Sequence, residues 1–266
     1  MRVTVCELPH EPAALAAAWA ALCEHTVRHS SELVLLPELA MVEPLWQDEI
    51  FDAARWEAAQ ELSDAWLHRL PELGVAKVVG TRPVTIDGRP FNQGFLWSAS
   101  GDLVLLRRKF FVPDEQGCWE ARWFDRGDAD FTEYQIDGWS FGLNICTELW
   151  AVETYATYAE HGVQVILTPR ATASVTTAKW LSAGLVAAVR SGAFSLSSNR
   201  VDPTGTCGGV GWIINPYGNI LAVTNTDAPF ATVNIDLSVS ATARDDYPCY
   251  VLSGKRQQPG SAKCVV

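Results

Sequence analysis

The sequence predicts a mixed α/β fold in which strands pair both parallel and antiparallel and helices lie outside the sheets. Three observations carry this prediction. Segments of helical spacing alternate with short apolar runs of strand character. Pairs of such runs are separated by glycine-containing turns that are typical of hairpins. The chain also has 266 residues and 48% hydrophobic content, which is enough to bury a large core.

The first half of the chain begins with a buried strand and a helix. Pro12 is a favourable first residue for an alanine-rich helix that reaches about residue 27. A second helix over 55–70 has its apolar residues at roughly helical spacing. The predicted strands of this half are 3–7, 33–36, 75–81, 92–97 and 103–108. The turn Ser100-Gly101-Asp102 joins the last two strands into a hairpin.

The second half continues the alternation and ends in hairpins. Its predicted elements are, in order, strands at 132–136 and 140–145, a helix at 153–160, a strand at 165–167, a helix at 177–190, and strands at 194–198, 211–214, 220–223 and 231–235. No linker rich in proline, glycine or serine, no charge block and no repeat interrupts them. We therefore expect a single domain over 1–266, with an irregular C-terminal tail over 240–266.

Composition limits the classes of partner. The formal net charge of −11 argues against a nucleic-acid or anionic-membrane surface and favours small-molecule partners. The seven cysteines form no CxxC pair and no cluster at metal-ligand spacing, so free thiols in a reducing compartment are the simplest interpretation. The N-terminus lacks the pattern of a secretory signal, and the apolar run at 13–23 is too short to span a bilayer. We expect a cytoplasmic protein without nucleic-acid or membrane partners.

Three apolar strands each end on a different polar residue. These residues are Glu38, Lys109 and Cys146. In open sheets, functional sites gather beyond the carboxyl ends of strands, so the three side chains can meet. Each alone has a structural interpretation: a solvated glutamate at a loop start, a solvated lysine after two arginines, and a buried cysteine. Their combination favours catalysis.

Glutamate, lysine and cysteine in this order, at strand ends in a chain of this size, resemble the nitrilase superfamily of carbon–nitrogen hydrolases. The segments that carry the resemblance are Met1-Arg2-Val3-Thr4-Val5, Pro37-Glu38-Leu39, Arg108-Lys109, Gly142-Leu143-Asn144-Ile145-Cys146 and Ser198-Asn199-Arg200. The resemblance implies a four-layer α-β-β-α sandwich in which two sheets face each other. By analogy it also implies a homo-oligomer, a dimer or higher.

Cleavage of a C–N bond gives these residues their expected roles. The reaction needs a nucleophile, a place for negative charge on the carbonyl oxygen, and a proton for the departing nitrogen. We expect Cys146 to attack and Glu38 to act as the base. Lys109 and the backbone N–H of Thr147 are expected to hold the oxyanion. No histidine adjoins the Cys146 segment, and the mechanism needs no metal or organic cofactor.

A second glutamate completes the predicted catalytic set. In enzymes of similar sequence, a glutamate from the segment after the lysine holds that lysine and contacts the substrate. Glu120 matches this position best, and Glu115 is the competing candidate. A glutamate on a helix surface is the structural alternative.

The predicted pocket wall is aromatic and contains one arginine. The expected substrate-binding residues are Phe111, Trp119, Glu148, Trp150, Tyr155 and Arg170. The guanidinium of Arg170 suits bidentate binding of a carboxylate, and an ion pair with Glu148 or Glu160 is the alternative. Glu148 either binds the substrate amine or anchors its turn through backbone N–H groups, and anchoring is favoured.

The sequence thus predicts a cysteine-dependent hydrolase of a non-peptide C–N bond in a small, carboxylate-bearing amide, through a thioester acyl-enzyme. The residues after the cysteine, Thr147-Glu148-Leu149-Trp150, differ from the tyrosine or asparagine, then aspartate and arginine, of many amidase and carbamoylase relatives. Hydrolysis of a nitrile or of an N-carbamoyl compound (a ureide) by the same three residues is one alternative. A catalytically silent binding or scaffold protein is the other.

Overall fold

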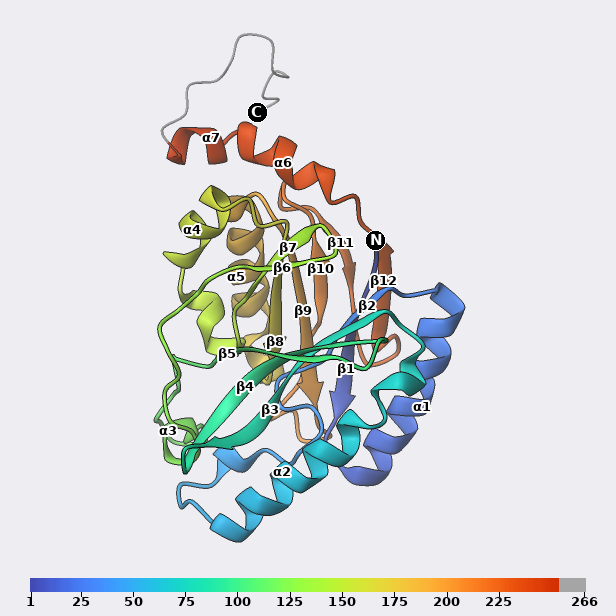
Figure 1. Cartoon of the computed structure of the whole chain (residues 1–266), viewed down its shortest axis with the longest axis vertical. Helices are drawn as coiled ribbons and strands as arrows, with labels where there is room; N and C mark the ends of the chain where they lie inside the picture. Colours follow the sequence, from blue (N-terminus) through green and yellow to red (C-terminus); the bar gives the residue numbers. More distant parts are fainter. Residues whose placement is uncertain (254–266) are drawn as a thin grey trace.

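The computed structural model describes residues 1–253, whose strands form two facing sheets between outer helices (Figure 1). The strands are β1 (Arg2–Pro9), β2 (Leu33–Leu35), β3 (Lys77–Ile86), β4 (Arg89–Ser98), β5 (Leu103–Arg108), β6 (Tyr134–Ile136), β7 (Trp139–Leu143), β8 (Val165–Arg170), β9 (Phe194–Val201), β10 (Trp212–Ile214), β11 (Ile220–Val223) and β12 (Phe230–Asn234). The α-helices are α1 (Pro12–His29), α2 (Ala53–Leu67), α3 (Glu120–Trp123), α4 (Thr154–Glu160), α5 (Thr177–Ser191), α6 (Ser238–Asp245) and α7 (Cys249–Leu252). Short 3₁₀ helices are η1 (Leu45–Gln47), η2 (Leu70–Leu73), η3 (Cys146–Trp150) and η4 (Ser174–Thr176).

Strand β1 joins the two sheets. The first sheet has the order β12-β1-β2-β3-β4-β5, and the second contains β6-β7-β8-β9 with β10 and β11. The start of β1 pairs with β2 and β12, while residues 7–9 at its end pair with β9. The strands therefore form one continuous hydrogen-bonded network.

The strands that precede the three predicted catalytic residues all run in one direction. Strands β1, β2 and β3 are parallel, β4 reverses the direction and β5 reverses it again. Strand β1 is also parallel to β9, which is parallel to β8 and, through it, to β7. The carboxyl ends of β2, β5 and β7 consequently lie at the same edge of the network, where the sequence predicts the site.

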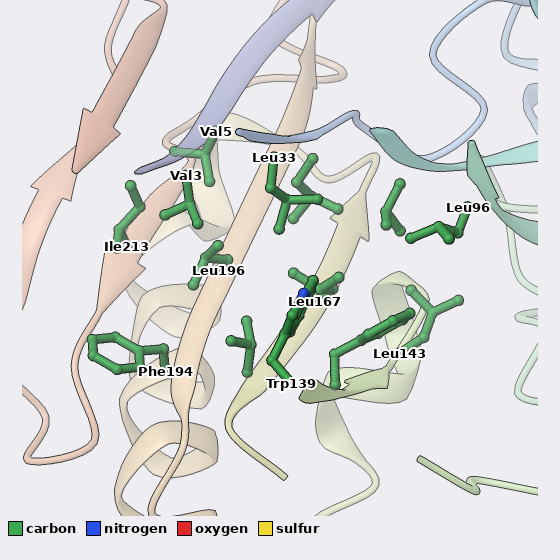
Figure 2. Close-up of a cluster of buried hydrophobic side chains, with 14 of the residues drawn as sticks. Val3, Val5, Leu33, Leu96, Trp139, Leu143, Leu167, Phe194, Leu196 and Ile213 are labelled. Carbon is green, nitrogen blue, oxygen red and sulfur yellow. The ribbon is translucent and has the colours of Figure 1, made fainter. Parts of the chain in front are cut away.

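Alternate residues of facing strands fill the space between the two sheets. Val3 and Val5 point into this layer from the first sheet, and Leu143, Leu167 and Leu196 come from the second (Figure 2). All five side chains are buried. Successive residues of a strand point to opposite faces, so the intervening residues face the helices.

Helices cover the outer face of each sheet. Trp19 of α1 and Trp66 of α2 pack against Val34 on the outer side of the first sheet. Tyr158 of α4 and the inner side of α5 pack against Ile166 of the second sheet. The layers follow the order helix, sheet, sheet, helix (Figure 1). This confirms the predicted four-layer sandwich.

Helix α1 begins where the proline predicts. Pro12 lies in its first turn, and the carboxylate of Glu11 accepts the backbone N–H groups of Ala13 at 3.2 Å and Ala14 at 2.8 Å. Ser30, in the left-handed conformation, ends the helix. The predicted helix is therefore confirmed, and its cap satisfies two otherwise free donors.

The C-terminal prediction is wrong in part. Residues from 240 onward were expected to be irregular, but α6 and α7 occupy much of 238–252. Ser240 and Ala243 are buried, and Arg244 donates to the carbonyl of Val163 at 2.9 Å, so this segment packs on the body of the protein. The remainder of the predicted tail, 254–266, lies outside the described residues.

None of the helices of residues 1–253 combines the length and the apolar character that crossing a bilayer requires.

Replacing Leu167 by alanine tests the layer between the sheets. The side chain is fully buried, so we expect Leu167→Ala to lower the free energy of unfolding by about 2–5 kcal/mol through lost burial and a residual cavity. Leu105→Ala on β5 is the matched control, because Leu105 is 56% exposed and should cost less than about 1 kcal/mol. Urea unfolding followed by tryptophan fluorescence measures both. Equal losses would contradict the assignment of the main core to this layer.

Candidate active site

Lys109 lies at the centre of a buried group of charges. It follows β5, and its ammonium donates to Oε1 of Glu38 at 2.8 Å and to Oε1 and Oε2 of Glu120 at 2.8 and 2.6 Å. The exposed fractions are 0% for Lys109, 2% for Glu38 and 5% for Glu120. Glu115, the competing candidate, is exposed and makes no ion pair with Lys109. The structure therefore brings the predicted residues Glu38, Lys109 and Glu120 together, away from solvent.

Asn92 and the end of β8 orient Glu38. The side-chain amide of Asn92 donates to Oε1 of Glu38 at 2.9 Å, and the backbone carbonyl of Asn92 accepts the backbone N–H of Lys109 at 2.9 Å. The backbone N–H of Glu38 donates to the carbonyl of Arg170 at 3.2 Å. Within residues 1–253, Oε2 of Glu38 accepts no hydrogen bond. One oxygen of this carboxylate is thus held in place and the other is available to take a proton.

Cys146 lies at the start of η3, in the turn of residues 145–151, which we call the Cys146 turn. Its φ is 50°, in the left-handed region that residues with a side chain rarely adopt. Cys146 is 4% exposed, so its thiol is buried. Strained backbone of this kind clusters at functional sites, where it directs a side chain.

Asn144 and Tyr158 brace the strand end before Cys146. The amide of Asn144 donates to the carbonyl of Glu148 at 2.9 Å, and the hydroxyl of Tyr158 donates to Oδ1 of Asn144 at 3.0 Å. Gly142 permits this contact, because a Cβ there would lie 2.5 Å from atoms of the Tyr158 ring. The position of the cysteine is therefore fixed from the helix layer as well as from the sheet.

Glu148 ties the Cys146 turn to the end of β5. Its Oε2 accepts the backbone N–H of Ile145 at 2.8 Å and forms an ion pair with Arg107. Its Oε1 accepts the backbone N–H of Phe110 at 2.7 Å. Arg107 and Phe110 flank Lys109 in sequence. Because Glu148 is 0% exposed and protein donors occupy both oxygens, its predicted substrate contact is corrected in favour of the anchoring alternative.

Burial and charge shift the pKa values of the site in different directions. Burial first, and then the carboxylate of Glu38, raise the pKa of the Cys146 thiol well above its ordinary value, although Lys109 opposes them. Burial by itself would lower the pKa of Lys109, but Glu120 and Glu38 outweigh it and raise that pKa. Burial raises the pKa of Glu120 to about 7, against the opposing charge of Lys109. The resting thiol is therefore protonated at neutral pH and needs a base to react.

A hollow of about 470 Å³ lies beside Thr147, the residue that follows Cys146. It is lined by Phe111, Val112, Pro113, Asp114, Glu115, Arg126, Thr147, Trp150, Lys179 and Trp180. Phe111 and Trp150, both predicted as pocket walls, are thus part of it. Among residues 1–253, the backbone N–H of Thr147 has no protein acceptor, so it is free to donate to a bound oxygen.

The charged group contains an amine and carboxylates. Among residues 1–253, no cluster of three or more histidine, cysteine, aspartate or glutamate side chains is arranged to hold a metal ion. The positive charge beside the thiol comes from the ammonium of Lys109.

Arg170 points into the protein. It is 1% exposed, and its Nε and Nη1 donate to the hydroxyls of Ser197 and Thr172, each at 2.7 Å, while Nη2 donates to the carbonyl of Val210. Protein oxygens therefore occupy all three nitrogens, which corrects the prediction that Arg170 binds a substrate carboxylate. The alternative also fails, because Arg170 forms no ion pair with a glutamate in the described part of the chain.

Two other predicted substrate contacts lie away from the hollow. Tyr155 is 0% exposed, packs in the core between α4, α5 and the second sheet, and donates its hydroxyl proton to the carbonyl of Leu149. Trp119 is half-buried and outside the lining, and its backbone N–H donates to the carbonyl of Trp46 at 2.7 Å. Both are therefore supporting residues, because their positions serve packing and loop geometry.

Asn92, Arg107 and Asn144 shape the site but were not predicted from the sequence. Asn92 and Asn144 are amides within or directly after otherwise apolar strands, and Arg107 is the first of three consecutive basic residues. Burial of a polar group is unfavourable unless it is hydrogen-bonded, so an amide in a buried strand signals a polar partner. That signal gives no indication of which partner it is.

Comparisons with known proteins agree with this architecture. The sequence profile of carbon-nitrogen hydrolases matches residues 2–245. The chain is 26% identical to the omega-amidase NIT2 of Homo sapiens over 204 residues, which covers 73% of this chain and 72% of that protein. It is 26% identical to Hydrolase C26A3.11 of Schizosaccharomyces pombe over 180 residues, 64% of this chain but only 56% of that protein. A carbon-nitrogen hydrolase from Helicobacter pylori G27 shares the fold, with a TM-score of 0.82 at 19% identity over 97% of this chain and 99% of that one.

Replacing Glu148 by glutamine tests the tie between the two strand ends. Glu148→Gln leaves Arg107 as an uncompensated buried charge, so we expect the free energy of unfolding to fall by about 3–5 kcal/mol. Glu32→Gln is the matched control, since Glu32 pairs with Arg2 at 46% exposure of both side chains and should cost less than about 1 kcal/mol. Chemical unfolding of both variants provides the comparison. A loss for Glu148→Gln no larger than for the control would show that the tie is dispensable.

Proposed function

The chain belongs to the carbon–nitrogen hydrolase family of the nitrilase superfamily and is an amidase-type hydrolase, and on this premise we propose that Cys146 cleaves a non-peptide C–N bond in a small, carboxylate-bearing amide through a thioester acyl-enzyme. One observation carries the proposal. Glu38, Lys109 and Glu120 form a buried charged group, and the charge of each member shifts the pKa of the Cys146 thiol. The omega-amidase among the relatives supports an amide as the substrate.

In the first half of the reaction, the sulfur of Cys146 forms a bond to the amide carbon while its proton passes to Oε2 of Glu38. The ammonium of Lys109 and the backbone N–H of Thr147 hold the oxyanion that develops. The tetrahedral intermediate then collapses and the C–N bond breaks. Glu38 returns the proton to the nitrogen, so the amine or ammonia leaves as a neutral molecule and a thioester remains.

In the second half, water replaces the departed amine. Glu38 takes a proton from this water as its oxygen attacks the thioester carbon, and Lys109 and Thr147 again hold the oxyanion. The C–S bond breaks, the sulfur regains its proton from Glu38, and the carboxylic acid leaves. A single carboxylate therefore serves as base and acid in both halves, which requires that one of its oxygens be free of protein donors.

Glu120 acts mainly through Lys109. Its two oxygens receive the ammonium at 2.8 and 2.6 Å and hold it beside Glu38. With its pKa raised to about 7 by burial, Glu120 also holds a proton more readily than an exposed glutamate does. We therefore assign it the positioning of the lysine, with contact to the substrate as the second part of its role.

Ammonia release tests the reaction class. The wild-type protein should release ammonia from small primary amides, and Cys146→Ala should lower the rate at least a thousandfold because no thioester can form. Lys109→Met should lower it about a hundredfold or more, since one oxyanion donor is lost. Cys249→Ala is the matched control: this cysteine is buried, and its thiol donates to the carbonyl of Val189 at 3.0 Å, outside the site.

Added hydroxylamine should divert the thioester to a hydroxamate in the wild-type protein, which colorimetry detects. Full activity of Cys146→Ala would remove this residue from the mechanism. Turnover of nitriles or N-carbamoyl compounds in place of amides would shift the assignment to those substrates. Absence of turnover with all amides, nitriles and N-carbamoyl compounds tested would favour a catalytically silent binding protein.

The pH dependence of thiol alkylation tests the charges around Cys146. Glu38 raises the pKa of the thiol and Lys109 lowers it, so the two substitutions should move the alkylation profile in opposite directions. Glu38→Gln should shift it toward lower pH and Lys109→Met toward higher pH, although both lower amide turnover. Iodoacetamide labelling followed by mass spectrometry of the Cys146 peptide measures the shift, with Cys23 as an internal reference. Shifts in the same direction would refute the proposed arrangement.

A further inference from the structure

Within the described part of the chain, two cations on the rim of the hollow lack an anionic partner. Arg126, from the loop between α3 and β6, and Lys179, from α5, are both exposed, and both line the hollow together with Thr147. Among residues 1–253, neither has a carboxylate oxygen within 4.0 Å. Arg122 and Arg108, in contrast, are paired: Arg122 with Asp114 at 2.9 Å and Arg108 with Asp128 at 2.5 Å.

Aromatic rings hold both cations against the walls of the hollow. The ammonium of Lys179 lies 5.3 Å from the centroid of the Trp150 ring, and the guanidinium of Arg126 lies 5.9 Å from that of Phe110. Such contacts stabilise a cation over a ring face and limit the side-chain positions that it samples. The two charges are thus placed at the entrance and oriented before any ligand arrives.

Acidic residues on the rim do not cancel these charges. Asp114 and Glu115 also line the hollow, but Asp114 is already neutralised by Arg122. Glu115 is the one remaining carboxylate of the lining, against two unpaired cations. In a chain with a net charge of −11, a rim with an excess of positive charge is a local exception that favours an anionic ligand.

We propose that Arg126 and Lys179 form the subsite for the substrate carboxylate, in the place for which the sequence predicts Arg170. The subsite rests on the proposed function and adds to it the substrate class: the monoamide of a small dicarboxylic acid. The amide end passes Thr147 to reach Cys146, and the carboxylate at the other end stays at the rim. Phe111, Trp150 and Trp180 pack against the carbon chain between the two ends.

The test compares two amides that differ in charge. Glutaramate carries a carboxylate, and pentanamide is a neutral amide of nearly the same shape. We expect the wild-type protein to favour glutaramate by about tenfold or more in kcat/KM, as charge-assisted hydrogen bonds imply. Arg126→Gln/Lys179→Gln should reduce this preference at least tenfold, mainly through KM for glutaramate, and the loss should shrink at high ionic strength.

Two matched variants control for charge and for side-chain size. Arg126→Lys/Lys179→Arg keeps both charges and should retain the preference. Arg2→Gln/Arg28→Gln removes the same amount of charge away from the hollow and should leave both activities unchanged. Equal kcat/KM values for the two amides in the wild-type protein, or an unchanged ratio in Arg126→Gln/Lys179→Gln, would overturn the subsite.

A binding measurement separates the subsite from the proposed function. If the wild-type protein hydrolyses neither amide, the proposed function fails, and calorimetric titration of Cys146→Ala with glutarate then decides the subsite alone. Binding of glutarate that weakens at least tenfold when Arg126→Gln/Lys179→Gln is added supports the subsite. Absent binding, or equal binding with and without the two cations, refutes it.

Discussion

The ammonium of Lys109, held between Glu38 and Glu120 in the interior, is the interaction on which the rest of the site depends. Three charged groups with exposed fractions of 0–5% would each be strongly disfavoured alone. Together they satisfy one another at 2.6–2.8 Å. The cluster leaves one oxygen of Glu38 without a donor and places a positive charge beside a thiol whose pKa burial has raised. Stability and reactivity therefore come from the same contacts.

This arrangement requires two strand ends from different sheets to keep a fixed separation. Lys109 follows β5 of the first sheet, and Cys146 follows β7 of the second. Glu148 bridges them. It accepts the backbone N–H of Ile145 just before Cys146, and near Lys109 it binds Arg107 and the backbone N–H of Phe110. The layer of Val and Leu side chains keeps the sheets together (Figure 2). Glu148 fixes the separation of the two strand ends at the edge that carries the site.

The protein separates the groups that react from the groups that select. The reacting groups are buried and bound mainly to one another, so their geometry is insensitive to what enters the hollow. The rim is exposed, aromatic and positively charged, and its side chains come from the loops after β5 and α3, from η3 and from α5. Such rim residues can change between relatives without loss of the buried cluster. Membership of the family therefore does not identify the substrate, and only the residues of the rim restrict which substrates can bind.

The sequence by itself determined most helices and strands up to residue 235 and the three strand-end residues, because periodicity, Pro12 and turn residues act over a few neighbouring positions. The sequence did not determine in which direction the other side chains near the site point. Arg170 turns inward because its acceptors, Ser197 and Val210, lie 27 and 40 positions along the chain, and α6 packs through a contact that spans 81 positions. The role of Glu148 likewise depends on distant partners, Arg107 and Phe110, which lie 41 and 38 positions away. Only the tertiary structure decided these roles, because the burial of a polar group depends on partners that local patterns do not contain.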